Sequence, residues 1–127
     1  MVYHYDYMRP QEVTVAVDLG RKKCTVNFDI TELPENDPTG FRYSWRSVTL
    51  EPGVWSYDSI VSAIIYLEYN PNQIEALNAN MIGALSGILT EGITKLSEYK
   101  EEFMTFTKWR LHAKAIAREI ITKYPKP

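Results

Sequence analysis

The amino-acid sequence predicts an α+β fold, in which a three-stranded antiparallel meander is followed by two or three packed helices, the last one long. Apolar and polar residues alternate within residues 11–50, which is the pattern of half-buried strands. Within residues 56–124 the apolar residues recur every three or four positions, as they do in amphipathic helices. Strands that precede helices favour an α+β fold over an alternating α/β fold.

The length of the chain indicates a single domain. A chain of 127 residues has the size of one domain and buries roughly two thirds of the surface that its unfolded form exposes. An apolar content of 45% and a charged content of 24% are typical of globular proteins. We therefore expect one domain over residues 1–127, with a β region at 11–50 and a helical region at 56–124.

A hairpin opens the β region, after an irregular aromatic stretch at residues 1–10. Apolar residues alternate with polar or small ones over residues 13–19 and again over residues 24–30, with Gly20 between the two runs. Two alternating runs around a short glycine-containing link predict a β-hairpin. Residues 31–40 contain two prolines and a glycine, so we expect a loop there.

The third strand is expected at residues 41–50, and its apolar residues change register. They are odd-numbered as far as Trp45 and even-numbered from Val48 onward. One bulge near Arg46 or Ser47 would bring them to a common face. Alternatively, the strand has two apolar faces, one covered by a helix and the other by a partner.

Two helices are predicted to follow the Pro-Gly pair at residues 52–53. Ser56 is a suitable N-cap for the first helix, which ends before Asn70 and Pro71. Asn72 is the expected cap of the second helix. Both segments carry apolar stripes at helical spacing.

The last helix is expected at about residues 94–123, after a break somewhere in residues 84–92. Three glycines between 83 and 92 weaken helix formation there, and Pro125 ends the helix. At 1.5 Å per residue this helix is about 45 Å long. Because that exceeds the size of the domain, we expect one end to project or to pack on a second subunit.

The periods of the strands and helices together predict which side chains form the core. The predicted core consists of Val15, Val17, Val26, Phe28, Val48, Ile60, Ile64, Leu67, Leu77, Phe103, Phe106 and Ile116.

Charge and hydropathy exclude several classes of partner. The net charge of −2 gives no basic stripe of the kind that binds nucleic acid. The longest apolar run is far shorter than the roughly 20 residues that span a bilayer, and the first ten residues lack the pattern of a signal peptide. We expect no nucleic-acid partner, no membrane contact and a soluble protein that is cytoplasmic when made.

The residues with reactive side chains do not form a catalytic pattern in the sequence. Cys24, the single cysteine, is expected to face inward as a small hydrophobe. His112 has neither an acid nor a nucleophile beside it in its helix, as catalysis would require. We expect no chemistry at either residue.

The acidic residues do not form the pattern of a catalytic carboxylate pair, and the possible metal ligands do not form that of a metal site. Glu98, Glu101 and Glu102 lie on one helix, which cannot place two carboxylates on opposite sides of a substrate. His4 and Asp6 are two metal ligands near a terminus, with no second cluster downstream. We therefore expect no enzyme activity, no catalytic residues, no cofactor and no metal.

Aromatic residues make up 13% of the chain, and nine of them are tyrosines. Exposed aromatic side chains suit protein interfaces. For Trp45, with Arg42 and Arg46 nearby, packing in the sheet, an interface and stacking on a base or sugar are all open. The candidate interface residues are Tyr43, Trp45, Tyr99, Phe106 and Trp109.

Three segments carry a resemblance to a known group of proteins. They read VWSYDSIVSAIIYLEY at 54–69, NQIEALNAN at 72–80 and WRLHAKAIARE at 109–119. This pattern resembles small uncharacterised proteins of Bacteroides phages and prophages that are encoded among tail and structural genes. The resemblance implies a structural or assembly role, association with the virion and no enzyme activity, and it assigns no functional residue.

The expected partners follow from this interpretation. We expect a homo-oligomer held by the last helix or an open sheet edge, or contact with other phage structural proteins. The alternative is a host-encoded binding or regulatory adaptor with a different partner.

Overall fold

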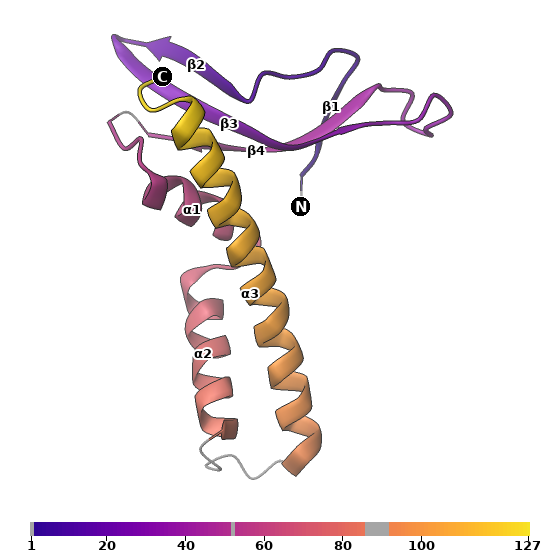
Figure 1. Ribbon diagram of the computed structural model, residues 1–127, viewed down its shortest axis with the longest axis vertical. Coiled ribbons are helices and arrows are strands. Elements are labelled where there is room, and N and C mark those ends of the chain that lie inside the picture. Colours follow the sequence, from indigo (N-terminus) through magenta and orange to yellow (C-terminus); the bar gives the residue numbers. More distant parts are fainter. Residues whose placement is uncertain (1, 52, 86–91) are drawn as a thin grey trace.

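The computed structural model describes residues 2–51, 53–85 and 92–127, with the side chains of residues 18 and 92–95 left aside (Figure 1). It confirms the α+β class, but the sheet has four strands where three were predicted. The elements in chain order are β1 (His4–Asp6), β2 (Val13–Asp18), β3 (Arg21–Glu32), β4 (Tyr43–Leu50), α1 (Tyr57–Ile65), α2 (Pro71–Leu85) and α3 (Gly92–Lys123).

The sheet is antiparallel throughout, in the order β1-β4-β3-β2. The predicted hairpin is present as β2 and β3, and β4 pairs with β3 on its other side. The additional strand is β1, in which His4 lies opposite Trp45. Its three residues are all exposed, so no apolar period marked it within residues 1–10.

A β-bulge lies in β3 and not in β4, so the predicted bulge near Arg46 or Ser47 is wrong. The pairing register shifts between Phe28 and Thr31, and Asp29 there has a left-handed φ of 52°. Along β4 every even-numbered residue is buried without interruption. The apparent register change arose because two of those inward residues are polar.

The second interpretation of this strand describes β4 better. Its even-numbered side chains face the helices, while Tyr43 and Trp45 lie half-buried on the opposite face of the sheet. That a partner covers this face stays a prediction.

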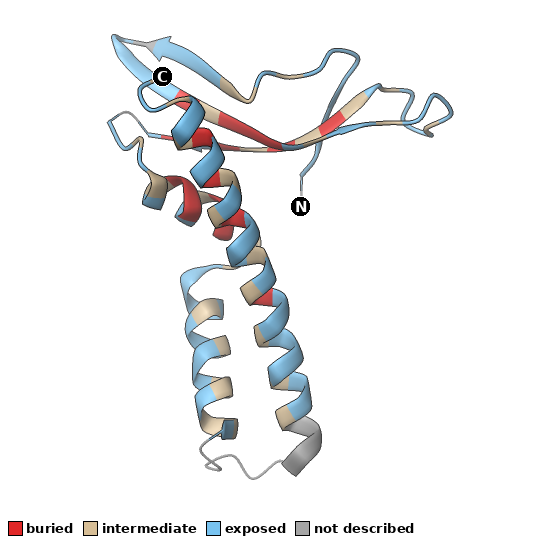
Figure 2. Ribbon diagram, in the orientation of Figure 1, coloured by how far each residue is buried: buried red, intermediate tan, exposed pale blue. Residues whose placement is uncertain are grey.

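One layer of helix covers part of one face of the sheet. In Figure 1, α1 and the C-terminal half of α3 lie beneath the sheet on the side of the β2–β3 hairpin. Figure 2 shows the buried residues gathered where these elements meet. The core cluster consists of Val26, Phe28, Val48, Leu50, Ile60, Val61, Ile64, Ile65, Phe106, Ala113, Ala117 and Ile120.

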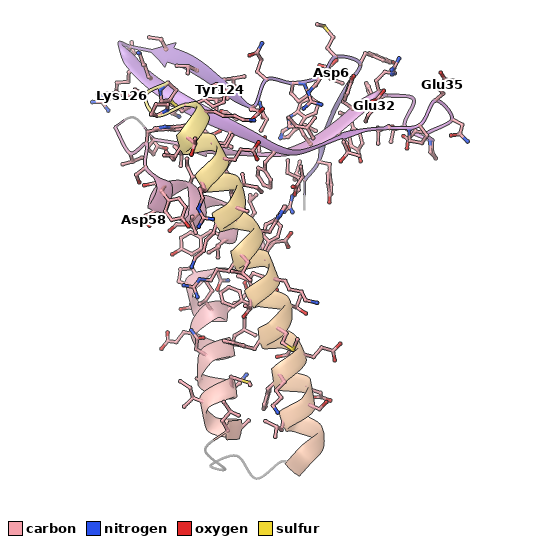
Figure 3. The ribbon with its side chains drawn as sticks, in the orientation of Figure 1. Asp6, Glu32, Glu35, Asp58, Tyr124 and Lys126 are labelled. Carbon is pink, nitrogen blue, oxygen red and sulfur yellow. The ribbon has the colours of Figure 1, made fainter. Side chains whose placement is uncertain are left out.

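The other part of the sheet extends past the helices. Figure 3 places Glu32 and Glu35 toward one end of the sheet and Tyr124 and Lys126 toward the other. β1 pairs with β4 near the first of these ends. The helices therefore support only part of the sheet that the structure describes.

Half of the predicted core is confirmed as buried: Val26, Phe28, Val48, Ile60, Ile64 and Phe106. Leu77, Phe103 and Ile116 are half-buried. Three predictions are wrong, because Val15, Val17 and Leu67 are 43%, 68% and 42% exposed. The valines lie on an edge strand that the helices do not cover, and Leu67 follows the end of α1.

α2 and the N-terminal half of α3 lie side by side and together are called the arm. It projects away from the sheet (Figure 1). None of the fifteen residues of α2, all of which the structure describes, is buried. α2 ends at Leu85 and α3 begins at Gly92. The predicted break at 84–92 falls on residues 86–91, which lie outside the described part, so it stays a prediction.

The caps of the helices were predicted correctly in one case of two. Ser56 caps α1, and its hydroxyl accepts a hydrogen bond from the Ser59 amide at 3.1 Å. Asn70, not Asn72, caps α2 through reciprocal 2.8 Å hydrogen bonds with Gln73. This capping box leaves Pro71 at the first helical position, where its missing N–H costs nothing.

Candidate functional site

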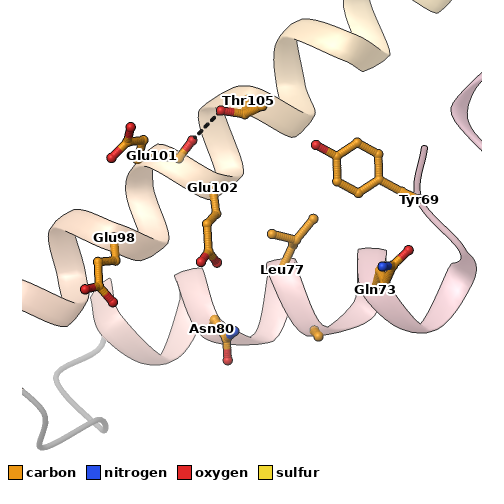
Figure 4. A pocket seen from close by; sticks show the side chains of 9 residues that line it. Tyr69, Gln73, Leu77, Asn80, Glu98, Glu101, Glu102 and Thr105 are labelled. Carbon is orange, nitrogen blue, oxygen red and sulfur yellow. Dashed lines mark hydrogen bonds between the residues drawn. The ribbon is translucent and has the colours of Figure 1, made fainter. Parts of the chain in front are cut away.

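A cleft of about 570 Å³ runs between α2 and α3 in the arm (Figure 4). Leu77 and Ala76 give it an apolar wall on α2, and Tyr69 stands at the end nearest the sheet. On α3 the wall is acidic. The nine lining residues are Tyr69, Gln73, Ala76, Leu77, Asn80, Glu98, Glu101, Glu102 and Thr105.

The three glutamates of the cleft all come from α3, as the sequence predicted. The wall on α2 offers Gln73 and Asn80 amides but no carboxylate among the described lining residues. In glycoside hydrolysis two carboxyl groups flank the bond that is broken. This arrangement places acid on one side alone, so it suits contact with a cationic group better than acid–base catalysis.

Tyr69 connects this cleft with the core. Its ring meets the edge of Phe106 at a centroid distance of 5.0 Å. Burial, and secondarily the charge of Glu68, raises the pKa of the Tyr69 phenol above its ordinary value. The phenol is therefore neutral at physiological pH and can serve as a hydrogen-bond donor.

Arg46 is the most unusual residue of the core. It is 4% exposed, and its guanidinium pairs with the Glu68 carboxylate at 2.8 Å. Its Cζ lies 4.7 Å from the ring centroid of Trp109, and 5.7 Å from those of Phe28 and Tyr3. Among the described residues no group accepts a hydrogen bond from its Nε.

This cluster joins three parts of the molecule that are distant in sequence. Arg46 comes from β4, Glu68 from the turn after α1, and Trp109 from the middle of α3. The Trp109 indole N–H also donates to the Ile64 carbonyl at 3.2 Å. Because the guanidinium packs on aromatic rings of its own chain, the cluster holds these elements together. Glu68 and Trp109 also line a hollow of about 380 Å³ beside it.

His112 of α3 lies beside the carboxylate of Asp29 in β3. Its Nε2 lies 2.7 Å from the Asp29 carboxylate, which the bulge in β3 presents to α3. A carboxylate beside an imidazole is the geometry that orients a general base, and a hollow of about 340 Å³ adjoins the pair. The acid that the helix itself does not supply therefore comes from β3, and the expectation that His112 carries no chemistry stays a prediction.

Among the described residues that line the hollows beside the pair there is no serine or cysteine. Thr105 and the Tyr69 phenol supply the hydroxyl groups among the described residues that line the hollows around His112. Thr105 lies seven residues from His112 along α3, a rise of about 10 Å. Its hydroxyl already donates to the Glu101 carbonyl at 3.0 Å.

The candidate interface residues fall into two groups. Tyr43, Trp45 and Tyr99 are half-buried, and the Trp45 ring stacks on His4 at 5.8 Å. Phe106 is 5% exposed within the core, so it cannot offer its ring to a partner. Trp109 is half-buried and contacts Arg46 and Ile64. As candidate interface residues, Tyr43, Trp45, Tyr99 and Trp109 stay predictions.

The remaining candidates are placed as follows. Cys24 is buried in β3 and lies opposite Val15 and Leu50. The Asp6 carboxylate accepts hydrogen bonds from the amides of the two residues that follow it. In the part of the chain that the structure describes, no three His, Cys, Asp or Glu residues are grouped as metal ligands.

Comparison with known proteins adds no relative. No family model, no curated protein and no solved structure matches this chain. Of the helices that the structure describes, none is both long and apolar enough to cross a membrane.

Proposed function

We propose that the protein acts through protein–protein contacts, as a non-enzymatic structural or assembly protein of a phage or prophage. Its exposed surface carries this proposal. The chain exposes 8747 Å², whereas a compact monomer of 14.7 kDa exposes roughly 6900 Å². The surplus of roughly 1800 Å² is about twice the 800 Å² that one partner contributes to a standard interface.

The arm exposes several large apolar side chains. Ile82 and Leu85 of α2 are 63% and 64% exposed, and Met104 on α3 is 58% exposed. A hairpin of two helices has too few neighbours to bury both of its faces. A partner protein that packs against the arm would remove these side chains from water.

The phage assignment is supported by the resemblance of residues 54–69, 72–80 and 109–119 to small phage and prophage proteins. The alternative, a host-encoded adaptor, would use the same surfaces for another partner. The genes beside the coding sequence separate the two, since capsid and tail genes favour the first and a regulatory operon favours the second.

Purified phage particles provide the experiment. We expect mass spectrometry to find the chain in particles released by the cells that encode it. The double variant Ile82→Glu, Leu85→Glu should fold normally, because both positions are exposed, but should be depleted from particles at least about tenfold. Asn72→Glu, an exposed position on the same helix near the sheet, is the matched control.

Two results would overturn the proposal. Absence of the wild-type chain from purified particles would refute the phage role. Equal incorporation of the double variant and the control would refute contact through the arm.

A further inference from the structure

β2 is an edge strand whose outer side is open. It pairs with β3, and no other described strand lies beside it. The register runs without a shift from Val13 to Asp18. Residues 13–17 contain neither a charged residue nor a proline, which are the devices that commonly block pairing at sheet edges.

Exposed apolar side chains accompany this edge. Val15 is 43% exposed and Val17 is 68% exposed, and Val13 is half-buried. All three lie on the face of the sheet toward the helices, because Val13 is paired with the buried Val26 and side chains alternate along a strand. β-branched residues on an uncovered edge leave apolar surface in water.

The direction of the main chain can be derived from one hydrogen bond. The Asn27 amide donates to the Glu12 carbonyl at 2.8 Å, so Glu12 directs its main-chain groups toward β3. Because that direction alternates along a strand, Thr14 and Ala16 also face β3. The N–H and C=O groups of the three valines therefore point to the open edge.

We propose that β2 pairs in antiparallel fashion with β2 of a second copy of this chain, about a two-fold axis at Val15. The inference rests on the proposed function, since it names one of the protein contacts that function requires. The sequence Val-Thr-Val-Ala-Val places its valines symmetrically about Val15. Val15 then lies opposite its own copy, Val13 opposite Val17 of the partner subunit, and the two sheets become one.

This register is the one that fits both the side chains and the main chain. Each of the three valine pairs exchanges both of its main-chain hydrogen bonds across the interface. A shift by one residue would turn the valines of the two copies to opposite faces. A shift by two in one direction would set Val13 against Leu19, whose φ of 51° takes it out of the strand. In the other direction it would set Val17 against Gln11, a polar residue that precedes β2.

A second copy is favoured over an unrelated strand because the segment complements itself. Valine meets valine on one face, and Thr14 meets Ala16 on the other. Closed two-fold pairing also leaves no further copy of this edge exposed. The contact covers side chains that the helices of a single chain do not reach.

Light scattering during size-exclusion chromatography tests the pairing. We expect the mass of two chains at micromolar concentration for the wild type. Val15→Pro removes an N–H that β3 does not use, so it should preserve the fold and raise the dissociation constant at least about tenfold. The control is Thr49→Lys on the inner strand β4, which should remain a dimer.

Cysteine cross-linking tests the register. Val15 lies opposite Cys24 within one chain, so the variants are made in a Cys24→Ala background. In a hydrogen-bonded pair the two Cα atoms at position 15 lie about 5.5 Å apart, a distance that a disulfide can span. Val15→Cys should therefore form linked dimers, whereas Val17→Cys, whose expected neighbour is Val13, should not.

The outcomes separate this inference from the proposed function. A wild-type mass of one chain, unchanged on tenfold concentration, would overturn the pairing even if the chain is found in particles. Linkage through position 17 without linkage through position 15 would overturn the register. A dimer through β2 that is absent from particles would instead support the pairing and refute the phage role.

Discussion

The buried cation of Arg46 connects several parts of this protein. Arg46 lies between the sheet, the turn after α1 and α3, and the Glu68 carboxylate lies at hydrogen-bonding distance. A guanidinium is tolerated in a core when a carboxylate and aromatic faces replace the water that it loses. The contribution of Arg46 to the free energy of unfolding thus depends mainly on whether the Glu68 carboxylate is present.

We expect Glu68→Gln to lower the free energy of unfolding by about 3 kcal/mol, because it leaves Arg46 buried without a counter-charge. Arg46→Met should lower the free energy of unfolding by less, because it removes the charge and keeps an apolar side chain of similar length. Urea denaturation measures both, with Glu75→Gln on the exposed side of α2 as the control. A loss for Glu68→Gln no larger than that of the control would show that the pair is immaterial.

Lys123 gives the fold a dependence on alkaline pH. Its hydrogen bond to Glu119, and next that to Glu12, raises the pKa of the ammonium above 10.5. The folded chain therefore holds the proton more tightly, so the stabilisation is complete below pH 10.5 and is lost as the pH rises through the raised pKa.

Accordingly, the free energy of unfolding should fall less steeply in Lys123→Met than in the wild type as the pH rises above 10.5. Urea denaturation at a series of alkaline pH values measures the slopes. Tyr69, whose pKa is also raised, contributes a decline of the same sign to both proteins. Parallel curves for the two proteins would contradict the role assigned to Lys123.

At the scale of elements, local patterns in the sequence predicted most of the structure. The periods of β2, β3 and α1 are local properties, and so is the cap at Ser56. β1 was missed because three exposed residues carry no period. Val15 and Val17 were assigned to the core because a period of two identifies a face but not whether a helix covers it.

The candidate site was predictable to a smaller extent. That the three glutamates share one helix follows from their spacing. The contact of His112 with Asp29 spans 83 residues and depends on a bulge in β3, for which the sequence of β3 gives no local signal. The inward position of Arg46 could be predicted in part, because it shares the even-numbered positions of Val48 and Leu50 along β4.

The difference between the core beneath the sheet and the half-buried residues of the arm predicts how substitutions by alanine rank. Ile64→Ala should lower the free energy of unfolding by about 2–5 kcal/mol, because Ile64 is fully buried and its truncation leaves a cavity. Phe103→Ala should cost less, because Phe103 is half-buried on the arm. Thermal denaturation measures both, with the exposed Ser62→Ala as the control. Equal midpoints for Ile64→Ala and this control would contradict the packing described.

For the whole molecule, stability is distributed unevenly. The buried residues concentrate between the sheet, α1 and the C-terminal half of α3 (Figure 2). The arm is held by half-buried contacts such as Ile74 and Leu77. Regions with few buried apolar contacts open at a lower free energy than the core does.

Hydrogen exchange makes this difference measurable. We expect the amides of α2 to exchange at least about tenfold faster than those in the last turn of α1, although both segments are helical. Mass spectrometry of peptides resolves the two helices. Protection of α2 equal to that of α1 would mean that a partner or a second copy already covers the arm.

The continuity of α3 also has a mechanical consequence. One continuous helix of 32 residues runs from the arm to the underside of the sheet. Trp109 fixes its middle through contacts with Arg46 and Ile64. The segment from Gly92 to Trp109 is a lever of about 26 Å. A load that tilts it by about ten degrees moves its free end by about 4.5 Å, while the segment from Trp109 to Lys123, about 21 Å long, tilts the opposite way against the strands.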